Sequence, residues 1–329
     1  MTAVDDAPTG PARVSLTFLP AGKSVRVPSG VSVFDAALWN GVPVDSTCGG
    51  HGTCKKCKVR VIDASLPISA LDERAFSAEQ LEQGWRLACQ CRVADDLSVE
   101  VFDPLRDGRA ASIVGCDWLT SDVLRLRLQP ERRLPYQAGQ HLVLWADASI
   151  ARPYSLASLP DADDWLELHI DCAKPGAFST AARGFQLGQS LRLGELRGGA
   201  LHYDPDWQAQ PLCLLAAGTG LAPLWGILRE ALRQTHSGPI QLLHLASEPA
   251  AHYLAAPLHA LAAQHPQLHI RLMTAAELPA ALAELRLVSR QTQALLCGGP
   301  ASVEAFARRL YLLGLPRNQV LADVFLPRA

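Results

Sequence analysis

Four cysteines constrain the fold of this chain more than any other feature of its sequence. Cys48, Cys54 and Cys57 fall within ten residues, in a glycine-rich segment, and Cys89 follows 32 residues after Cys57. Three thiolates on one short loop and a fourth from farther along the chain form the ligand set of a [2Fe–2S] cluster. Glycines let the backbone wrap closely and turn its N–H groups toward the sulfurs of a negatively charged cluster. The pattern therefore predicts that these four cysteines bind two irons.

A structural zinc site is the alternative to a cluster. Cys54 and Cys57 are separated by two residues, and together with Cys89 and Cys91 they could form a four-thiolate zinc site. This alternative leaves Cys48 and its neighbouring glycines without a role. We therefore favour the cluster and interpret Cys91 as a spare thiol.

The residues around the cysteine loop are basic. Such a group is typical of a solvated face, and the alternative is a docking patch for an acidic electron acceptor, because complementary charge speeds association. His51 could suggest a cluster with two His ligands, but the loop has a single His, so we interpret it as a loop residue. The basic residues are Lys55, Lys56, Lys58 and Arg60.

Length and composition limit the number and kind of domains. The 329 residues are enough for two or three domains, and 49% hydrophobic with 19% charged residues can bury several cores. A net charge of −2 argues against a general nucleic-acid-binding protein. Nine cysteines in a long chain without a secretory signal indicate reduced, metal-binding thiols, so we expect a cytoplasmic protein.

One apolar stretch has the length of a membrane span. Residues 211–228 carry no charge, but Gly218, Gly220 and Pro223 interrupt them. A buried strand, a glycine turn and a helix explain the stretch better than a bilayer does. We expect no integral membrane segment.

The first expected domain, residues 12–103, combines short strands with one helix. Ser32 is the predicted N-cap of a helix over 32–40 that ends at Gly41, and Ala21-Gly22 is a predicted hairpin turn. Two hairpins packed on a helix resemble the β-grasp fold of [2Fe–2S] ferredoxins. The expected strands cover 14–18, 24–27, 58–62 and 97–102.

The spacing of the first two cysteines and the sequence around Cys89 add to this resemblance. The five residues between Cys48 and Cys54 resemble the spacing in adrenodoxin-like ferredoxins and in the ferredoxin domain of the sodium-pumping NADH:quinone reductase. The segment Arg86-Leu-Ala-Cys-Gln90 resembles the fourth-ligand segment of ferredoxins, which implies Cys89 as the fourth ligand.

The second expected domain, residues 108–208, contains many short alternating stretches separated by turn residues. This spacing is typical of a small antiparallel barrel, which we expect to have six strands. The clearest stretches are 111–114, 123–128, 142–145, 166–170 and 191–193.

The segment Arg152-Pro-Tyr-Ser155 resembles the Arg-x-Tyr-Ser flavin signature of the ferredoxin–NADP reductase family. The resemblance implies that Arg152 binds a flavin phosphate and that Tyr154 lies against the isoalloxazine ring. It also implies that Ser155 offers its hydroxyl to flavin N5. Tyr154 and Ser155 are therefore catalytic candidates in a flavin-binding barrel.

Two companion segments resemble the same family. Ala138-Gly-Gln140 resembles its Pro-Gly-Gln turn, with Ala in place of Pro. Gly176 and Ser179 match its Gly-x-x-Ser/Thr phosphate site, where N–H groups at a helix start hold the pyrophosphate. An N-terminal ferredoxin resembles the FAD-using benzoate, toluene and methane oxygenase reductases rather than the FMN-using phthalate type, which implies FAD. Two aromatic residues are candidates for stacking on the adenine: Tyr203 and Trp207.

The third expected domain, residues 211–329, begins with a buried strand over 212–217, a glycine turn and a helix over 224–232. Strand, turn and helix form the context in which a glycine motif binds a dinucleotide. The motif ends in Pro where the common Gly-x-Gly-x-x-Gly ends in Gly, and this variant resembles the same reductase family. The glycines would admit the pyrophosphate, and the helix N-terminus supplies partial positive charge. The candidate residues are Gly218, Thr219, Gly220 and Pro223.

Further apolar strands, with helices between them, predict a doubly wound parallel sheet. Cys297-Gly298 begins a segment that resembles the family's Cys-Gly-x-Pro turn, which implies that Cys297 lies near the nicotinamide as a catalytic candidate. Asp323 and Phe325 resemble its C-terminal acidic and aromatic pair near the flavin. The additional strands are expected over 240–245, 268–272 and 293–297.

The sequence also bears on the choice between NADH and NADPH. Glu248 follows the second strand of this domain, where the ribose is recognised. A carboxylate there accepts hydrogen bonds from the 2′-hydroxyl and repels a 2′-phosphate. We expect NADH to be preferred.

The three segments together predict one electron path in a multidomain α+β and α/β oxidoreductase. NAD(P)H donates a hydride, flavin accepts the electron pair and releases electrons singly, and a [2Fe–2S] cluster carries one at a time. The resemblance implies an electron-accepting partner protein, such as the oxygenase of an aromatic compound. Two alternatives stay open: a redox or iron sensor without turnover, and a subunit docked to a membrane quinone reductase, against which the missing N-terminal anchor argues.

Overall fold

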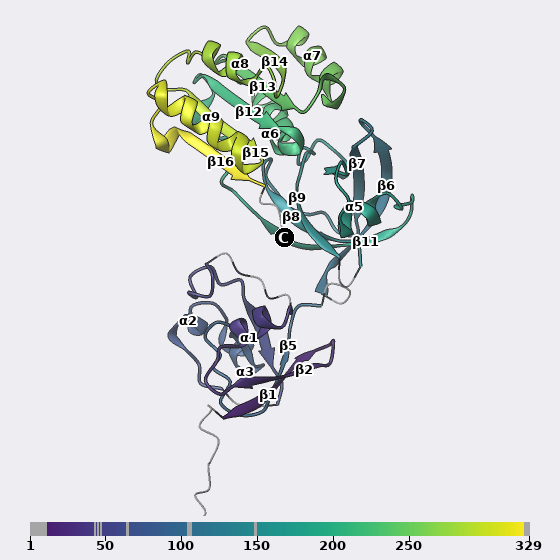
Figure 1. Ribbon diagram of the computed structural model, residues 1–329, viewed down its shortest axis with the longest axis vertical. Coiled ribbons are helices and arrows are strands. Elements are labelled where there is room, and N and C mark those ends of the chain that lie inside the picture. The colour runs from purple at the N-terminus through teal and green to yellow at the C-terminus, as the bar shows by residue number, and fades with distance from the viewer. Residues whose placement is uncertain are drawn as a thin grey trace, which may run out of the picture. The chain divides into compact units, whose positions relative to one another are not determined.

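The computed structural model describes residues 12–42, 44, 46, 48–63, 66–103, 107–147 and 150–325. The chain divides into two compact units, Met1–Asp103 and Pro104–Ala329 (Figure 1). The end of the first unit coincides with the end of the expected 12–103 domain. The expected separation of 108–208 from 211–329 falls inside the second unit, so the division into three domains stays a prediction.

The first unit contains a five-stranded mixed sheet in the order β2-β1-β5-β3-β4, and its described residues also form the short helices α1, α2 and α3. β1 and β2 form the predicted hairpin, and β1 also pairs in parallel with β5. The helix α1 buries Val33, Ala36 and Ala37 against this sheet. The elements are β1 (Arg13–Leu19), β2 (Lys23–Pro28), α1 (Val33–Trp39), β3 (Lys58–Val61), α2 (Ala70–Glu73), α3 (Ala78–Glu82), β4 (Trp85–Leu87) and β5 (Leu97–Glu100).

Both predicted ends of α1 are confirmed. The Ser32 hydroxyl accepts a hydrogen bond from the Asp35 N–H at 3.0 Å, which satisfies one donor of the first turn. Gly41 follows the helix with φ +66°, a left-handed conformation that glycine adopts without steric strain.

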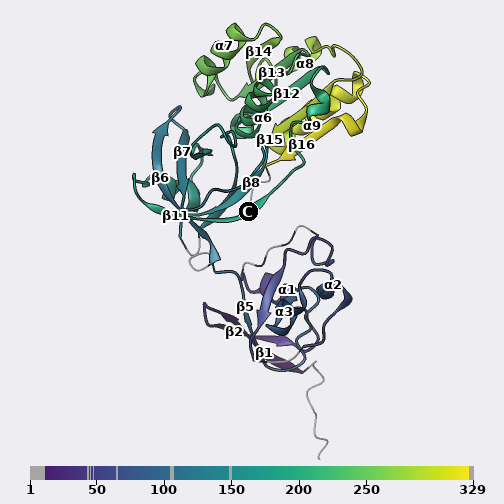
Figure 2. The same ribbon diagram turned by 180° about the vertical axis from the view of Figure 1, so that it is seen from behind.

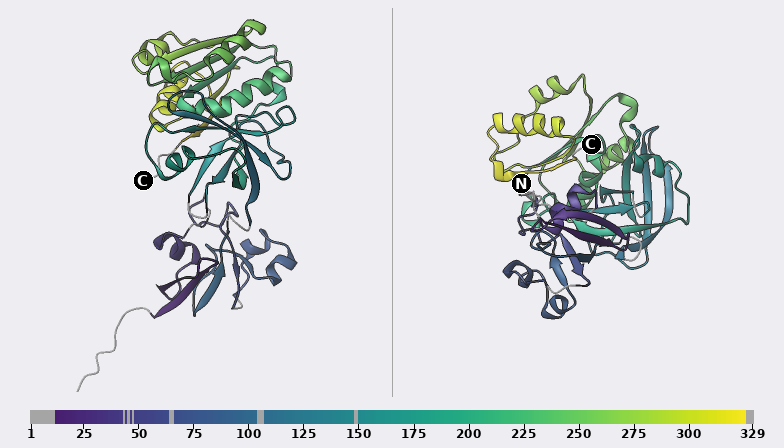
Figure 3. Two further views of the ribbon diagram at one scale, coloured as in Figure 1. Left: turned by 90° about the vertical axis from the view of Figure 1, so that its right-hand side faces the viewer. Right: turned by 60° about the horizontal axis from the view of Figure 1, so that its bottom comes forward.

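The second unit begins with a six-stranded antiparallel sheet in the order β10-β7-β6-β11-β8-β9. A bridge between Leu156 and Leu168 joins the two edges, so the sheet curls into the predicted barrel (Figure 3). β9 is not among the expected strands; it contains Pro153, which the sheet tolerates because β9 lies at its edge. The elements are β6 (Arg109–Trp118), β7 (Val123–Pro130), β8 (His141–Trp145), β9 (Ala151–Ser155), β10 (Leu166–Asp171), α5 (Ala177–Ala182), β11 (Ser190–Arg197) and η1 (Pro205–Trp207).

A parallel five-stranded sheet in the order β14-β13-β12-β15-β16 completes this unit (Figure 2). Helices α6 and α7 contribute to an apolar cluster on one face, and α8 and α9 to a second cluster on the other face, which confirms the doubly wound arrangement. The elements are β12 (Leu212–Ala217), η2 (Gly218–Gly220), α6 (Leu221–Arg233), β13 (Ile240–Ala246), η3 (Pro249–Ala251), α7 (Ala255–Gln264), β14 (Leu268–Thr274), α8 (Leu278–Glu284), β15 (Gln293–Gly298), α9 (Pro300–Leu312), η4 (Arg317–Gln319) and β16 (Val320–Val324).

The apolar stretch 211–228 is strand β12, turn η2 and the first part of α6. Across the described ranges, no helix combines the length and the apolar character that crossing a bilayer requires.

Helix α6 packs directly on the barrel. At Gly226, an added Cβ would lie 3.4 Å from three carbonyl oxygens of residues 156–158, so glycine lets the helix approach the chain that follows β9. Arg229 then donates two hydrogen bonds of 2.7 Å to the Asp163 carboxylate, which also accepts the Leu159 N–H. The helix that begins at the glycine turn is therefore fixed to the segment that follows the flavin signature.

We expect Asp163→Ala to lower the free energy of unfolding by about 2 kcal/mol, because it leaves the partly buried Arg229 guanidinium without its carboxylate. Urea denaturation followed by tryptophan fluorescence measures this loss. The control is Arg133→Ala, which breaks a pair whose side chains are 75% and 76% exposed and should change stability by less than about 0.5 kcal/mol. Equal losses in the two variants would contradict this account of α6.

Candidate iron–sulfur, flavin and nicotinamide sites

The four predicted cluster ligands lie as two pairs. The Sγ atoms of Cys57 and Cys89 are 3.3 Å apart. The Sγ atoms of Cys48 and Cys54 lie 3.9 and 4.0 Å from one shared group, the Ser46 hydroxyl. In a [2Fe–2S] cluster each iron takes two protein ligands, so two pairs of thiols fit this centre.

The same geometry bears on the zinc alternative. A mononuclear zinc site gathers three or four ligands around one point. Where the structure describes the chain, no group of three or more His, Cys, Asp and Glu side chains is arranged to hold a single ion. Cys91, which the zinc alternative requires, is 4% exposed within the apolar core.

The backbone of the cysteine loop passes close to the side chains of Phe34 and Leu71. Gly50 has φ +93°, and a Cβ added there would lie 3.2 Å from the Phe34 ring. A Cβ added at Gly52 would lie 2.6 Å from Leu71 Cδ1. Glycine is required at both positions because of conformation and space, which agrees with the close wrapping expected from the sequence.

The thiols differ in how readily they ionise. Hydrogen bonds from the Cys54 backbone N–H and then from its thiol lower the pKa of Cys48 to about 5. Burial raises the pKa of Cys57 to about 12 and that of Cys91 to about 12. Because only thiolates bind metal, loading this loop must release a proton from Cys57.

Two of the four basic residues near the loop are engaged within the unit. Arg60 pairs with Glu100 at 2.6 Å, and the Lys55 ammonium donates to the Arg74 carbonyl at 2.7 Å. These contacts favour the interpretation of a solvated face over that of a dedicated docking patch.

The flavin signature lies on β9, which pairs with β8. The Tyr154 ring packs against Phe178 of α5 with centroids 5.0 Å apart. Burial raises the pKa of Tyr154, so its hydroxyl stays protonated. Arg152 and Tyr154 project to one side of the strand and Ser155 to the other, and their contacts with flavin stay predictions.

The phosphate site predicted at Gly176 and Ser179 is only partly available. The Ser179 hydroxyl donates to the carbonyls of Lys174 at 2.9 Å and Gly176 at 3.2 Å. Its proton is therefore committed to the turn. The N–H groups at the start of α5, which have no partner within the helix, are the donors left for a phosphate.

Two turns at the carboxyl edge of the parallel sheet pack against each other. A Cβ at Gly220 would lie 2.3 Å from the Cys297 carbonyl oxygen, and a Cβ at Gly298 would lie 2.7 Å from Ala217 Cβ. β12 and β15 are neighbours, so the two predicted dinucleotide segments meet at one place. Pro223 sits in the first turn of α6, where a backbone N–H has no partner within the helix.

The C-terminal strand β16 places Asp323 beside Cys297, and the Phe325 N–H donates to the Gly298 carbonyl at 2.8 Å. Burial raises the pKa of Cys297 and that of Asp323. The Cys297 side chain is 0% exposed, so its contact with nicotinamide stays a prediction.

The remaining candidates have distinct environments. Tyr203 is buried, and its hydroxyl contacts His236 Nδ1 at 3.1 Å, so it packs between elements rather than offering a face to adenine. Glu248 is exposed at the N-cap of η3, where its side chain makes no capping hydrogen bond. Its carboxylate is therefore placed to meet a ligand from solvent.

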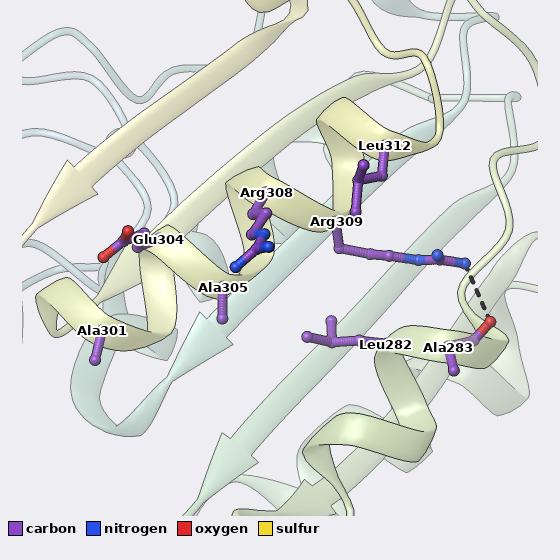
Figure 4. Close-up of a pocket in the computed structure, with 8 residues that line it drawn as sticks. All are labelled: Leu282, Ala283, Ala301, Glu304, Ala305, Arg308, Arg309 and Leu312. Atoms are coloured by element: carbon purple, nitrogen blue, oxygen red, sulfur yellow. Dashed lines mark hydrogen bonds between the residues drawn. The ribbon is translucent and has the colours of Figure 1, made fainter.

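A separate groove lies between α8 and α9 (Figure 4). Arg309 of α9 crosses it and donates to the Ala283 carbonyl at 3.0 Å. None of the eight residues that line this groove is a predicted site residue.

Family models match the chain in three consecutive parts. Residues 16–94 match a 2Fe-2S iron-sulfur cluster binding domain, 118–201 an oxidoreductase FAD-binding domain, and 214–309 an oxidoreductase NAD-binding domain. The reductase component of a Pseudomonas putida naphthalene 1,2-dioxygenase system is 30% identical over 95% of this chain and 99% of that protein. The chain belongs to the oxygenase-reductase type of the ferredoxin–NADP reductase superfamily.

Other relatives agree with this membership. The reductase subunit of an Amycolatopsis aromatic O-demethylase is 30% identical over 93% of this chain and 97% of that protein. The solved structure of an Amycolatopsis cytochrome P450 reductase superposes with a TM-score of 0.61 at 26% identity, covering 95% and 99% of the two chains. One component of the Na(+)-translocating NADH-quinone reductase of Chlamydia pneumoniae is 36% identical, but over only 35% of this chain and 28% of that protein.

This reductase therefore uses a [2Fe–2S] cluster, FAD and NAD(P)H, and it passes electrons from NAD(P)H through FAD to the cluster. The sequence alone did not single out Ser46, whose hydroxyl contacts two of the predicted ligand thiols, or His244, a polar residue in a buried strand. The histidine carried a usable signal, because it interrupts an apolar run.

We expect Cys89→Ser to lose most of its iron, because the Cys57 thiol loses its partner at the second iron. Cys91→Ser is the matched control, two residues away, and should keep its iron. Iron and acid-labile sulfide per chain, with the visible absorption spectrum, measure the outcome. Iron retained in Cys89→Ser and lost in Cys91→Ser would reverse the ligand assignment.

Proposed function

We propose that this protein is the NADH-preferring reductase component of an oxygenase system, and that it delivers single electrons to a separate electron-accepting protein. The observation that carries the proposal is the order of the three matched domains together with the near full-length similarity to oxygenase reductase components. Free, buried thiols such as Cys172 and Cys213 support a reducing compartment such as the cytoplasm.

Each site has residues suited to its group. The two thiol pairs would hold the irons, and the β9 segment with the start of α5 would hold the flavin and its phosphates. The N–H groups of the turn after β12 would bind the dinucleotide pyrophosphate. When bound, FAD converts the electron pair of a hydride into single electrons. The chain itself supplies position, orientation and electrostatics.

The two alternatives from the sequence are less well supported. The similarity to the quinone reductase component covers about one third of the chain, whereas the oxygenase reductase components match nearly all of it. A sensor without turnover has no use for a flavin site and a dinucleotide site on one compact unit.

The test is turnover by purified protein with full flavin and iron content. We expect NADH-dependent reduction of ferricyanide and of cytochrome c, with a higher kcat/KM for NADH than for NADPH. Both acceptors take one electron at a time, but ferricyanide is small enough to take electrons from the flavin, whereas the proposal has cytochrome c take them from the cluster. Removal of the cluster by Cys89→Ser should therefore reduce cytochrome c reduction far more than ferricyanide reduction. A fully loaded protein without turnover would overturn the reductase assignment.

Glu248 gives a separate prediction about the nucleotide. Glu248→Gln should lower kcat/KM for NADH about 5- to 10-fold, because the 2′-hydroxyl loses a charged acceptor, and should improve kcat/KM for NADPH. Glu304→Gln removes an exposed carboxylate of α9 and is the charge-matched control. An unchanged NADH to NADPH ratio in Glu248→Gln would place the ribose elsewhere.

A further inference from the structure

His244 is a fully buried polar residue beneath the glycine turn. It lies on β13 and is 0% exposed. Its strand neighbours Ile240 and Leu242 belong to the apolar cluster between the sheet and helices α6 and α7. A buried imidazole requires hydrogen-bond partners, because an unpaired polar group in such surroundings is destabilising.

The partner of this imidazole is the glycine turn itself. His244 Nε2 lies 3.1 Å from the Gly218 carbonyl oxygen. A carbonyl only accepts, so Nε2 carries the proton and donates. The same oxygen accepts the Leu221 N–H within the turn, so both of its lone pairs are used.

A second histidine is placed to pair with the other nitrogen of this ring. His252 Nδ1 lies 3.4 Å from His244 Nδ1, and the rings meet edge to face with centroids 5.1 Å apart. Since Nε2 of a neutral His244 holds the proton, its Nδ1 accepts, and His252 is the donor. Burial lowers the pKa of His244 to about 4, so the ring stays neutral at physiological pH.

The ring is also held in place by packing. The Tyr253 ring meets His244 edge to face with centroids 5.5 Å apart, and it also meets His169 of the barrel strand β10 edge to face with centroids 5.1 Å apart. Tyr253 is fully buried, so this stack has no room to tilt. The direction of the His244 Nε2–H bond is therefore fixed.

The hydrogen bond from His244 to the Gly218 carbonyl determines the direction of the Thr219 N–H. Gly218 has φ +54°, and the peptide that joins it to Thr219 is trans. In a trans peptide the C=O and the following N–H point in opposite directions. Because the Gly218 carbonyl points into the sheet at His244, the Thr219 N–H points away from it. Gly218 is exposed and Thr219 half-buried, so this donor faces the carboxyl edge of the sheet.

We propose that His244, in the Nε2–H form that its contact with the Gly218 carbonyl requires, is a positioning residue that holds the Gly218–Thr219 peptide with its N–H toward the dinucleotide phosphate. The inference rests on the proposed use of this turn for NADH. It assigns His244 no contact with the reacting atoms. Its effect is on the affinity for the nucleotide.

The test compares two substitutions of different chemistry. His244→Gln keeps an N–H donor at about the reach of Nε2, whereas His244→Leu fills the space without a donor. We expect His244→Leu to raise the Kd for NAD+ and the KM for NADH about tenfold, with kcat within about twofold. His244→Gln should stay within about threefold of the parent protein. Calorimetry gives the Kd without turnover, and the flavin and iron content of each variant verifies loading.

The outcomes separate this inference from the function on which it rests. If the parent protein fails to oxidise NADH, the proposed function fails. If the parent protein is active but His244→Leu binds NAD+ as tightly, or His244→Gln is as impaired as His244→Leu, the positioning role fails. Nitrogen-15 NMR of labelled histidine in the parent protein is a check independent of folding of the variants, and an Nδ1–H form of His244 would overturn the proposal.

Discussion

Backbone contact between two turns at the carboxyl edge of the parallel sheet is the constraint on which the nicotinamide half of this reductase depends. The turn after β12 approaches the end of β15 so closely that no side chain fits at Gly220 or at Gly298. Helix α6 starts from the first of these turns, and its Gly226 and Arg229 fix it to the barrel. Helix α6 is thus fixed at its start by the contact with β15 and farther along by its contacts with the barrel, which together set the position of its N-terminus.

Buried polar contacts continue this constraint into the barrel. Burial alone would raise the pKa of Glu167, but hydrogen bonds from His169 and Arg127 lower it to about 2, so the carboxylate stays charged in the interior. His169 then packs on Tyr253, and Tyr253 on His244. The barrel and the glycine turn are therefore connected through side chains that leave little freedom to either, as positioning two reactants for hydride transfer requires.

The first unit has a different task, because a small domain must accommodate several negatively charged thiolates close together. Its loop has glycines where the backbone passes over Phe34 and Leu71, and its thiols lie in two pairs. Two pairs of thiols suit two irons, with two protein ligands on each, whereas the zinc alternative needs Cys91 in place of Cys48.

Features that depend on local geometry could be predicted from neighbouring residues. The cysteine spacing, the Ser32 N-cap, the Gly41 helix end and the glycine turn each follow from a few neighbouring residues, and so did most strands. The expected strands lacked β4, β9 and β16, which are all edge strands and need not be apolar throughout. Tertiary structure alone decided the pairing of the thiols, the commitment of the Ser179 hydroxyl to its own turn, and the place of His244 beneath Gly218. These are contacts between individual atoms, and two of the three join residues far apart in the chain. A sequence pattern indicates the local conformation of a segment, but it does not indicate which distant atoms the segment will contact.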